Sequence, residues 1–275
     1  MLHPFYQPDI TEALLARASA NCGRTVTRRE INDAIRNSAA CAWKPKGRRT
    51  RYSPQRQCSP PPPPPPRWPA YNPQAVAEIV ADGPRQADLL ELSPIRVDPV
   101  DNTAELLQQL FPGDPLVCMG ETVYKFITRP LSHLIKHYPL ETFPLVTQSP
   151  MVQQWGITAD GKPSERSLTN IGQRKFQVVE FDKDKGTLDQ QAAIHWHLAR
   201  FAPLVLVVFS GSESLHGWYN VVGEAEADVT RFFKYATSLG ADTPMASPIQ
   251  MTRTPNAFRD NGTRQTVNYY NPSLI

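Results

Sequence analysis

Two acidic residues, spaced two apart at the end of an apolar run, carry the strongest chemical signal in this sequence. Glu180 and Asp182 follow Val178 and Val179, and β-branched residues of this kind favour a strand. Side chains two apart in a strand point to the same face, so these two carboxylates can share a cation. Carboxylates that close repel each other unless a positive charge lies between them. The pattern therefore predicts a site for a divalent metal ion.

A loop of small residues follows a second apolar run. Residues 204–209 read as a buried strand, and the loop after it, residues 210–216, has the sequence SGSESLH. Ser212, Ser214 and His216 offer hydroxyl and imidazole groups, and the backbone amides of such a loop can surround an anion. We expect this loop to hold the triphosphate of a nucleotide.

These two segments together resemble a known family. Glu180-Phe181-Asp182 is similar to the acid-hydrophobic-acid first motif of the archaeo-eukaryotic primase superfamily, the primase-polymerases, with Glu where Asp is commoner. Ser214-Leu215-His216 is similar to the Ser-x-His second motif of that family. The third motif is an acid beyond a helix, for which Asp242 is the candidate and Asp184 and Asp228 are competitors.

The resemblance continues to the C-terminus. Residues 250–259, with the sequence QMTRTPNAFR, look like an Arg-x-Pro segment seen in plasmid and phage members. The resemblance covers residues 102–275 and implies an α+β fold, with an RRM-like primase-polymerase catalytic core and an added N-terminal α/β unit. It implies template-directed nucleotidyl transfer, by a DNA primase or polymerase that replicates a mobile replicon.

The resemblance also implies roles for individual residues. Catalysis and the binding of two Mg²⁺ or Mn²⁺ ions would fall to the acids Glu180, Asp182 and Asp242. Nucleotide binding would fall to Ser212, Ser214, His216 and Arg253. Oxygen ligands suit Mg²⁺ or Mn²⁺ and argue against zinc. Arg253 and Arg259 can also bind phosphates or the template strand, and they would counter charge on the leaving pyrophosphate.

Charge is distributed unevenly along the 275 residues. Residues 1–67 hold 12 Lys or Arg against 4 Asp or Glu, a net charge of +8, and the remainder has a net charge of −5. Arg48, Arg49 and Arg51 could neutralise phosphates and so bind DNA without sequence preference. A solvated basic linker explains the same residues equally well.

The composition suggests four parts. A small helical basic region at 1–44 is expected to hold helices from Thr11 to about Gly23 and from Thr27 to about Ala42. A proline-rich linker follows at 45–69, whose seven-proline run is expected to be an extended spacer. A helical connector at 70–101 leads into the catalytic domain at 102–275. There we expect helices at 103–110, 130–137, 187–199 and 224–238, and strands at 116–119, 143–146, 178–182, 204–209 and 215–222.

Several sequence patterns bear on partners and location. No apolar run is long enough to span a membrane, and the N-terminus does not read as a signal peptide, so a cytoplasmic protein is expected. The four cysteines form no Cys-x-x-Cys pair, which favours free thiols over a zinc ribbon. No phosphate-binding Gly-x-x-x-x-Gly-Lys motif occurs, so a helicase would be a separate partner. The expected partners are a single-stranded DNA template and nucleoside triphosphates.

Other interpretations stay open. His195-Trp196-His197, with Tyr269-Tyr270, matches the His-hydrophobic-His pattern of rolling-circle nucleases, although on a helix the two histidines would point about 200° apart. The loop at 160–167, with the sequence DGKPSERS, could grip a template or be an ordinary surface turn. A replication-initiation module that binds DNA without catalysis is a third possibility.

Overall fold

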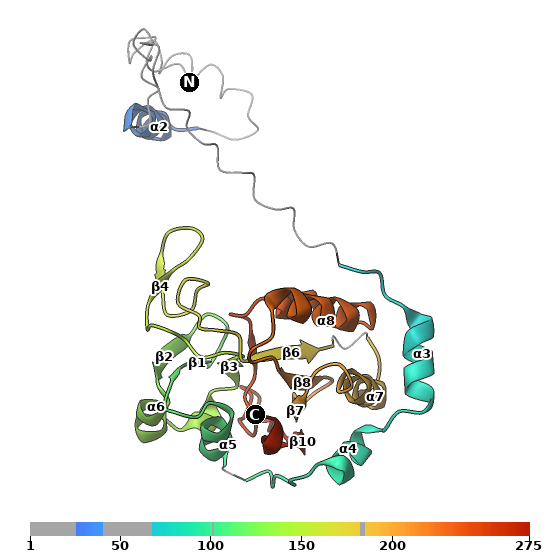
Figure 1. The fold of residues 1–275 in the computed structure, drawn as a ribbon. Helices are drawn as coiled ribbons and strands as arrows, with labels where there is room; N and C mark the ends of the chain where they lie inside the picture. The colour runs from blue at the N-terminus through green and yellow to red at the C-terminus, as the bar shows by residue number, and fades with distance from the viewer. Residues whose placement is uncertain (1–25, 41–67, 101, 182–184) are drawn as a thin grey trace, which may run out of the picture. The chain divides into compact units, whose positions relative to one another are not determined.

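The computed structural model describes residues 26–40, 68–100, 102–181 and 185–275 (Figure 1). The chain divides into two compact units, Met1–Pro64 and Pro65–Ile275. In the first unit α2 spans Arg28–Ala40. It begins with the predicted capping box, in which the Thr27 hydroxyl accepts a bond from the Glu30 amide and the Glu30 carboxylate accepts one from the Thr27 amide. The helix expected at Thr11–Gly23 lies outside the described residues.

The second unit contains two four-stranded antiparallel sheets. The first has the order β2-β1-β3-β9 and is accompanied by two short helices. Its elements are β1 (Leu116–Gly120), β2 (Phe126–Pro130), β3 (Leu145–Thr147), β9 (Met251–Arg253), α5 (Thr103–Leu110) and α6 (Leu131–His137). Three of these strands are consecutive in the chain, whereas β9 comes from the C-terminal segment. The sheet therefore ties residues near 250 to residues near 145.

The second sheet has the order β10-β7-β8-β6. Its elements are β6 (Phe176–Glu180), β7 (Leu204–Phe209), β8 (Leu215–Asn220), β10 (Val267–Tyr270), α7 (Leu188–Leu198) and α8 (Glu226–Ser238). The chain order β6-α7-β7-β8-α8 places β8 between the two strands that precede it. After α8, Ala241 forms an isolated antiparallel bridge with Phe181. The chain thus returns beside the end of β6.

The strands of this second sheet are buried along almost their whole length because both of their faces are covered. All but the last residue of β6, and likewise of β7, is buried, a pattern that alternation between core and solvent would not produce. The helix α7 packs against the sheet through His195, whose ring contacts the Tyr219 hydroxyl and the Leu215 carbonyl of β8. Both α7 and α8 (Figure 1) contact Tyr219 of β8, through His195 and Phe232, so they cover the same face. On the other face Trp218 contacts Phe111, which follows α5.

Two helices ahead of the first sheet pack on α7. They are α3 (Pro73–Ala81) and α4 (Gln86–Leu92). The Asn72 side chain caps α3 by accepting a bond from the Ala75 amide, and the Gln86 amide at the start of α4 donates to Asp189 in the first turn of α7. The connector predicted at 70–101 therefore contains two helices, and both belong to the second unit.

The α+β class is confirmed, and most helices begin and end within a few residues of their predicted bounds. The short strands were missed: β2, β9, β10 and the hairpin of β4 (Gly156–Ile157) and β5 (Pro163–Ser164). The strand expected at 143–146 was placed too early, because Leu140–Thr142 forms a 3-10 turn (η1) and β3 begins at Leu145. The strand of the predicted metal site ends at Glu180. Among the described helices, none is long and apolar enough to cross a membrane.

Candidate functional site

A cavity of about 380 Å³ opens where the two sheets of the second unit meet. Residues of β6 and β8 form one side of it, and residues of β3 and β9 form the other. The lining residues are Val123, Leu145, Glu180, Phe181, Ser212, Glu213, Ser214, His216, Gln250, Met251, Thr252, Arg253 and Arg259. The structure therefore brings together six residues that the sequence predicted for the site, from segments up to 79 residues apart.

Glu180 and His216 form the centre of the cavity. They are directly opposite each other in the antiparallel pairing of β6 and β8, which brings the two side chains within contact distance on one face. The Glu180 Oε2 atom lies 2.8 Å from His216 Nδ1. The side chain of His216 is almost fully buried, whereas that of Glu180 is 22% exposed, on the cavity side. Glu180 can thus reach a ligand while it holds His216.

The pKa of Glu180 is lowered, although burial acts in the opposite direction. Desolvation raises the pKa of this carboxyl, but the charge of His216, its hydrogen bond, and the more distant charge of Arg253 together lower it by a larger amount. Glu180 is therefore ionised at neutral pH. An ionised carboxylate with one oxygen paired to His216 keeps lone pairs for a cation or for a donor on a ligand.

The imidazole of His216 has partners at both nitrogens. Besides Glu180, Nδ1 lies 3.1 Å from the Thr252 hydroxyl, and Nε2 lies 3.4 Å from the Ser214 hydroxyl. Ser214 itself donates to the Ser210 hydroxyl, at 3.0 Å. Ser214, His216 and Glu180 are thus linked in the order serine, histidine, acid, as in a catalytic triad. Because the Ser214 proton is directed to Ser210 and not to His216, the arrangement suits ligand binding better than attack by Ser214.

Arg259 closes the cavity from the C-terminal segment. Its Nη1 atom donates to the Ser212 hydroxyl at 2.7 Å, and its buried Nε has no hydrogen-bond partner among the residues that the structure describes. Gly211 allows this approach: its φ is +80°, and a Cβ there would lie 2.9 Å from Thr263 Cγ2. The loop that presents Ser212 and the turn that carries Arg259 can therefore pack closely.

Arg253 lies near Arg259, and the two guanidinium groups repel each other. Burial lowers the pKa of Arg253, and the charge of Arg259 lowers it further, whereas Glu180 and Asp260 raise it by less. Both side chains nevertheless stay charged, because the pKa of arginine is too high for deprotonation in proteins. Two cationic groups beside one cavity, with incomplete compensation from nearby acids, favour the binding of an anion such as a phosphate chain.

The predicted metal ligands are brought together only in part. The Asp242 amide donates to the Glu180 carbonyl at 2.9 Å, so the backbone of the third predicted acid lies beside that of the first. Asp242 does not line the cavity. Asp182 lies outside the described residues, and so does its competitor Asp184. Within the described ranges no group of three His, Cys, Asp or Glu side chains could hold a metal ion.

The competitor Asp228 is placed away from the site. It lies in the first turn of α8 and pairs with Arg231 on the surface. It does not line the cavity, so of the three candidates for the third acid Asp242 is the one whose backbone contacts the end of β6. The basic residues Arg48, Arg49 and Arg51, predicted to bind nucleic acid, lie outside the described residues.

Two polar residues of the site were not singled out in the sequence. Thr252 contacts His216 from β9, whose sequence is Met251-Thr252-Arg253, and its position next to Arg253 is the only sequence signal for it. Gln191 is fully buried in α7, where its side chain accepts a bond from the Leu215 amide and donates to the Glu213 carbonyl. It holds the serine loop from behind. A polar residue on the buried face of an amphipathic helix is the only sequence signal for such a role.

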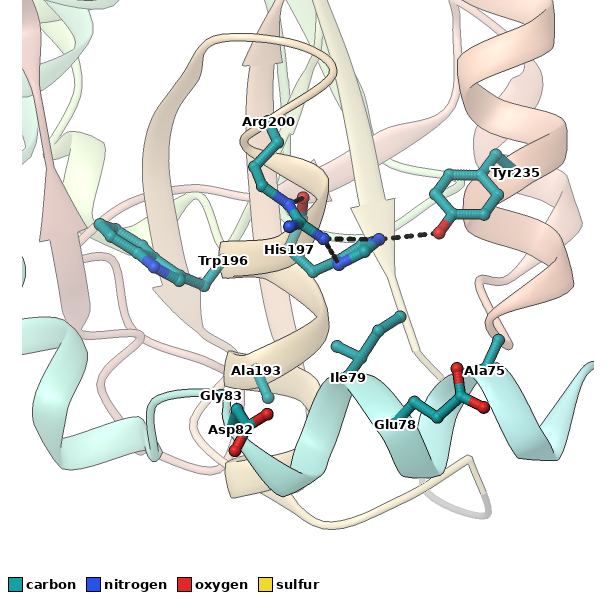
Figure 2. A pocket seen from close by; sticks show the side chains of 10 residues that line it. All are labelled: Ala75, Glu78, Ile79, Asp82, Gly83, Ala193, Trp196, His197, Arg200 and Tyr235. Carbon is teal, nitrogen blue, oxygen red and sulfur yellow. Dashed lines mark hydrogen bonds between the residues drawn. The ribbon is translucent and has the colours of Figure 1, made fainter.

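A second, larger cavity lies on the outer side of α7 (Figure 2). Its volume is about 450 Å³, and α3, α7 and α8 line it. The Arg200 guanidinium group contacts Nδ1 of the His197 ring. The other ring nitrogen, Nε2, lies 2.7 Å from the Tyr235 hydroxyl. Burial and the charge of Arg200 both lower the pKa of His197. This cavity contains no residue that the sequence predicted for nucleotide binding.

The two histidines of the nuclease-like pattern point in different directions. His195 is fully buried against β8, where burial lowers its pKa to about 3, and His197 faces the outer cavity. Tyr269 and Tyr270 are buried in β10. The pattern therefore does not form a shared metal site, as its position within a helix predicted.

Comparison with protein-family models, with curated proteins and with solved structures found no match. The resemblance of the sequence motifs to the primase-polymerases therefore stays a prediction.

Proposed function

We propose that this protein catalyses template-directed nucleotidyl transfer, as a DNA primase or polymerase that replicates a mobile replicon. The observation that carries the proposal is the cavity in which an ionised acid, a buried histidine, serine hydroxyls and two guanidinium groups converge. Glu180 and His216 occupy neighbouring positions on two strands, and Arg253 and Arg259 face them from the C-terminal segment. A carboxylate on one side of the cavity and two guanidinium groups on the other suit a metal-bound polyphosphate.

The order of the elements supports the same proposal. The elements β6, α7, β7, β8 and α8 form a βαββα segment. After α8 the chain returns beside β6 at Ala241, so β6 has β8 as one neighbour and Ala241 as the other. This agrees with the βαββαβ order of an RRM-like core, with the strand after the second helix reduced to one bridge. The sheet β2-β1-β3-β9 with α5 and α6 would be the added α/β unit.

The proposed ligands are all carboxylates, which suit magnesium or manganese, and Glu180 is the one that lines the cavity. Glu180 would hold the ion with its free oxygen, and Asp182 and Asp242 would complete the ligand set. Bound there, two such cations would stabilise the attacking and the leaving oxygens of an in-line displacement. The lowered pKa of Glu180 supports this role, since an ionised carboxylate is the ligand form.

The chain's own residues would position the nucleotide. His216, held by Glu180 and Thr252, presents Nε2 to the cavity beside Ser214. Arg259 and Ser212 would bind one end of the phosphate chain, and Arg253 would neutralise charge that develops on the departing pyrophosphate. Apolar side chains of Val123, Leu145 and Met251 limit the access of water from the opposite wall.

Synthesis on a single-stranded DNA template tests the proposal. The purified protein is incubated with template, labelled nucleotides and Mg²⁺ or Mn²⁺, with and without a primer. The Glu180→Ala/Asp182→Ala double variant should reduce product at least about 100-fold, because loss of metal coordination removes several kcal/mol of transition-state stabilisation. DNA binding should be retained. The matched control is Glu224→Ala, which removes an exposed acid outside the cavity and should leave synthesis unchanged.

The outcome separates three functions. Product without a primer indicates a primase, and extension of a supplied primer alone indicates a polymerase. DNA binding without synthesis in any lane would reject the enzyme and favour a non-catalytic replication-initiation module. Nicking of the template would favour the nuclease.

A further inference from the structure

The turn between β1 and β2 is a rigid support for an exposed aromatic ring. The Glu121 amide donates to the Lys125 carbonyl, which closes the turn, and the Thr122 hydroxyl accepts bonds from the amides of Tyr124 and Lys125. These bonds hold Tyr124 at the tip, where it is 93% exposed. Full exposure of a tyrosine on a well-bonded turn leaves both faces of its ring open to a ligand.

Arg166 fastens this turn to the wall of the candidate site. Its guanidinium group donates to the carbonyls of Val123 and Ile249, and it stacks on the Phe126 ring at 4.9 Å from the centroid. Arg166 belongs to the 160–167 loop that the sequence suggested for gripping a template. In the structure Arg166 connects the turn to the segment just before Gln250, which lines the cavity, and so acts as a positioning residue.

The turn continues the cavity outward. Val123 lines the cavity together with Glu180 and Arg253, whereas its neighbour Tyr124 does not. A mononucleotide whose phosphates lie against Arg253 and Arg259 would fill much of about 380 Å³. A ligand that also covers Tyr124 must therefore extend beyond one nucleotide, as a strand does.

We propose that Tyr124 is a stacking platform for an unpaired base of a single-stranded nucleic acid that enters the candidate site. The inference rests on the proposed function, because it takes the cavity to hold a nucleotide opposite that strand. Every base has a π-face, so such a platform binds single strands without sequence preference. Arg166 holds the turn that carries Tyr124 in a fixed position relative to the cavity.

Binding of fluorescein-labelled oligothymidylate to the full chain, followed by anisotropy over a series of salt concentrations, tests the platform. Tyr124→Ala should weaken binding about 5- to 100-fold, and Tyr124→Phe should stay within about twofold of wild type because it keeps the ring. The slope of log affinity against log salt should not change, since stacking releases no counterions. Phe201→Ala is the control. It removes another exposed ring, which is 59% exposed and follows α7 in the chain, and it should not change oligonucleotide binding.

The proposal is overturned if Tyr124→Ala binds the oligonucleotide as tightly as wild type, or if Phe201→Ala weakens binding equally. It is also overturned if Tyr124→Ala loses affinity for N-methylanthraniloyl-ATP with Mg²⁺ to the same degree, which would place the ring in the nucleotide site. Failure of the proposed function looks different. In that case synthesis and Arg259-dependent ATP binding are absent, while the oligonucleotide defect of Tyr124→Ala persists and supports the platform.

Discussion

At the scale of residues, Glu180 has two tasks that compete for one carboxylate. One oxygen is paired with His216, and the other has no hydrogen-bond partner among the described residues, which leaves it for a ligand in the cavity. The pairing keeps Glu180 ionised in spite of burial, and it orients the imidazole so that Nε2 faces Ser214. The same contact therefore prepares both the acid and the histidine. Loss of His216 should therefore change the titration of Glu180.

His216→Ala should raise the pKa of Glu180 above its usual value of about 4.3. Burial then acts with only the weaker opposing charge of Arg253, whereas in the wild type the pKa is lowered. A depressed carboxyl pKa contributes stability above the unfolded value, and this contribution is lost as pH falls through the folded value. Carboxyl ¹³C NMR titration of the Glu180 side chain measures the shift. An unchanged pKa in the variant would contradict the pairing.

Arg259→Ala should weaken nucleotide binding about 10- to 100-fold, because hydrogen bonds to a charged group contribute about 1.5–3 kcal/mol each. Arg259 lines the cavity, so its guanidinium group is the one that a phosphate there would contact. Titration with N-methylanthraniloyl-ATP and Mg²⁺ provides the measurement. The matched control is Arg231→Ala, since Arg231 is 79% exposed and pairs with Asp228 on α8. Equal losses in both variants would mean that the effect is general charge and not the site.

At the scale of elements, α7 supports the serine loop and β8 from behind. Gln191 bonds to both sides of the loop, and His195 packs against the strand. Gly217 of β8 makes this packing possible, because a Cβ there would lie 2.4 Å from His195 Nδ1. Such a distance cannot be accommodated without displacement of the helix or the strand. The separation of α7 from the sheet is therefore determined by a glycine opposite a histidine.

Gly217→Ala should destabilise the protein by about 1–3 kcal/mol, as overpacking of a filled core does. Urea denaturation followed by far-UV circular dichroism gives the free energy of unfolding. In the His195→Ala background the same change should cost less, because the atom that collides is gone. If the two changes were simply additive, the predicted contact would be wrong.

At the scale of the whole molecule, the excess of basic residues and the residues of the candidate site are separated along the chain. Residues 1–67 carry a net charge of +8 and the rest a net charge of −5, while every described residue of the candidate site belongs to the unit Pro65–Ile275. Affinity for the DNA backbone and the chemistry of the site can therefore be tested independently.

Deletion of residues 1–64 should leave a folded unit that still extends a primer, because the core and the cavity lie within Pro65–Ile275. Its binding to single-stranded DNA should weaken, and the slope of log affinity against log salt should fall by about 0.7 for each phosphate that the shortened chain no longer neutralises. Fluorescence anisotropy over a salt series, together with primer extension, measures both effects. An unchanged slope would show that the basic segment does not bind DNA.

Local patterns were enough to predict most helices, the buried strands and six of the residues that line the cavity. The capping boxes at Thr27 and Thr187, the apolar run of β7 and the serine loop all depend on neighbours in the chain, which is why they can be read from it. The α+β class followed from their order. The strands β4, β5 and β9 are two or three residues long and carry too little periodicity to be recognised.

Tertiary structure decided which of those residues meet. The alignment of Glu180 with His216 depends on the register of β6 and β8, and the contact of His216 with Thr252 depends on how two sheets pack. Neither is written in local spacing, because strand register and sheet packing arise from contacts between distant segments. By contrast, the divergence of His195 and His197 follows from local spacing, because residues two apart on a helix point about 200° apart. The contacts of Arg166 with the Val123 and Ile249 carbonyls likewise join segments far apart in the chain, whereas the sequence offered only a loop that could grip a template or be a surface turn.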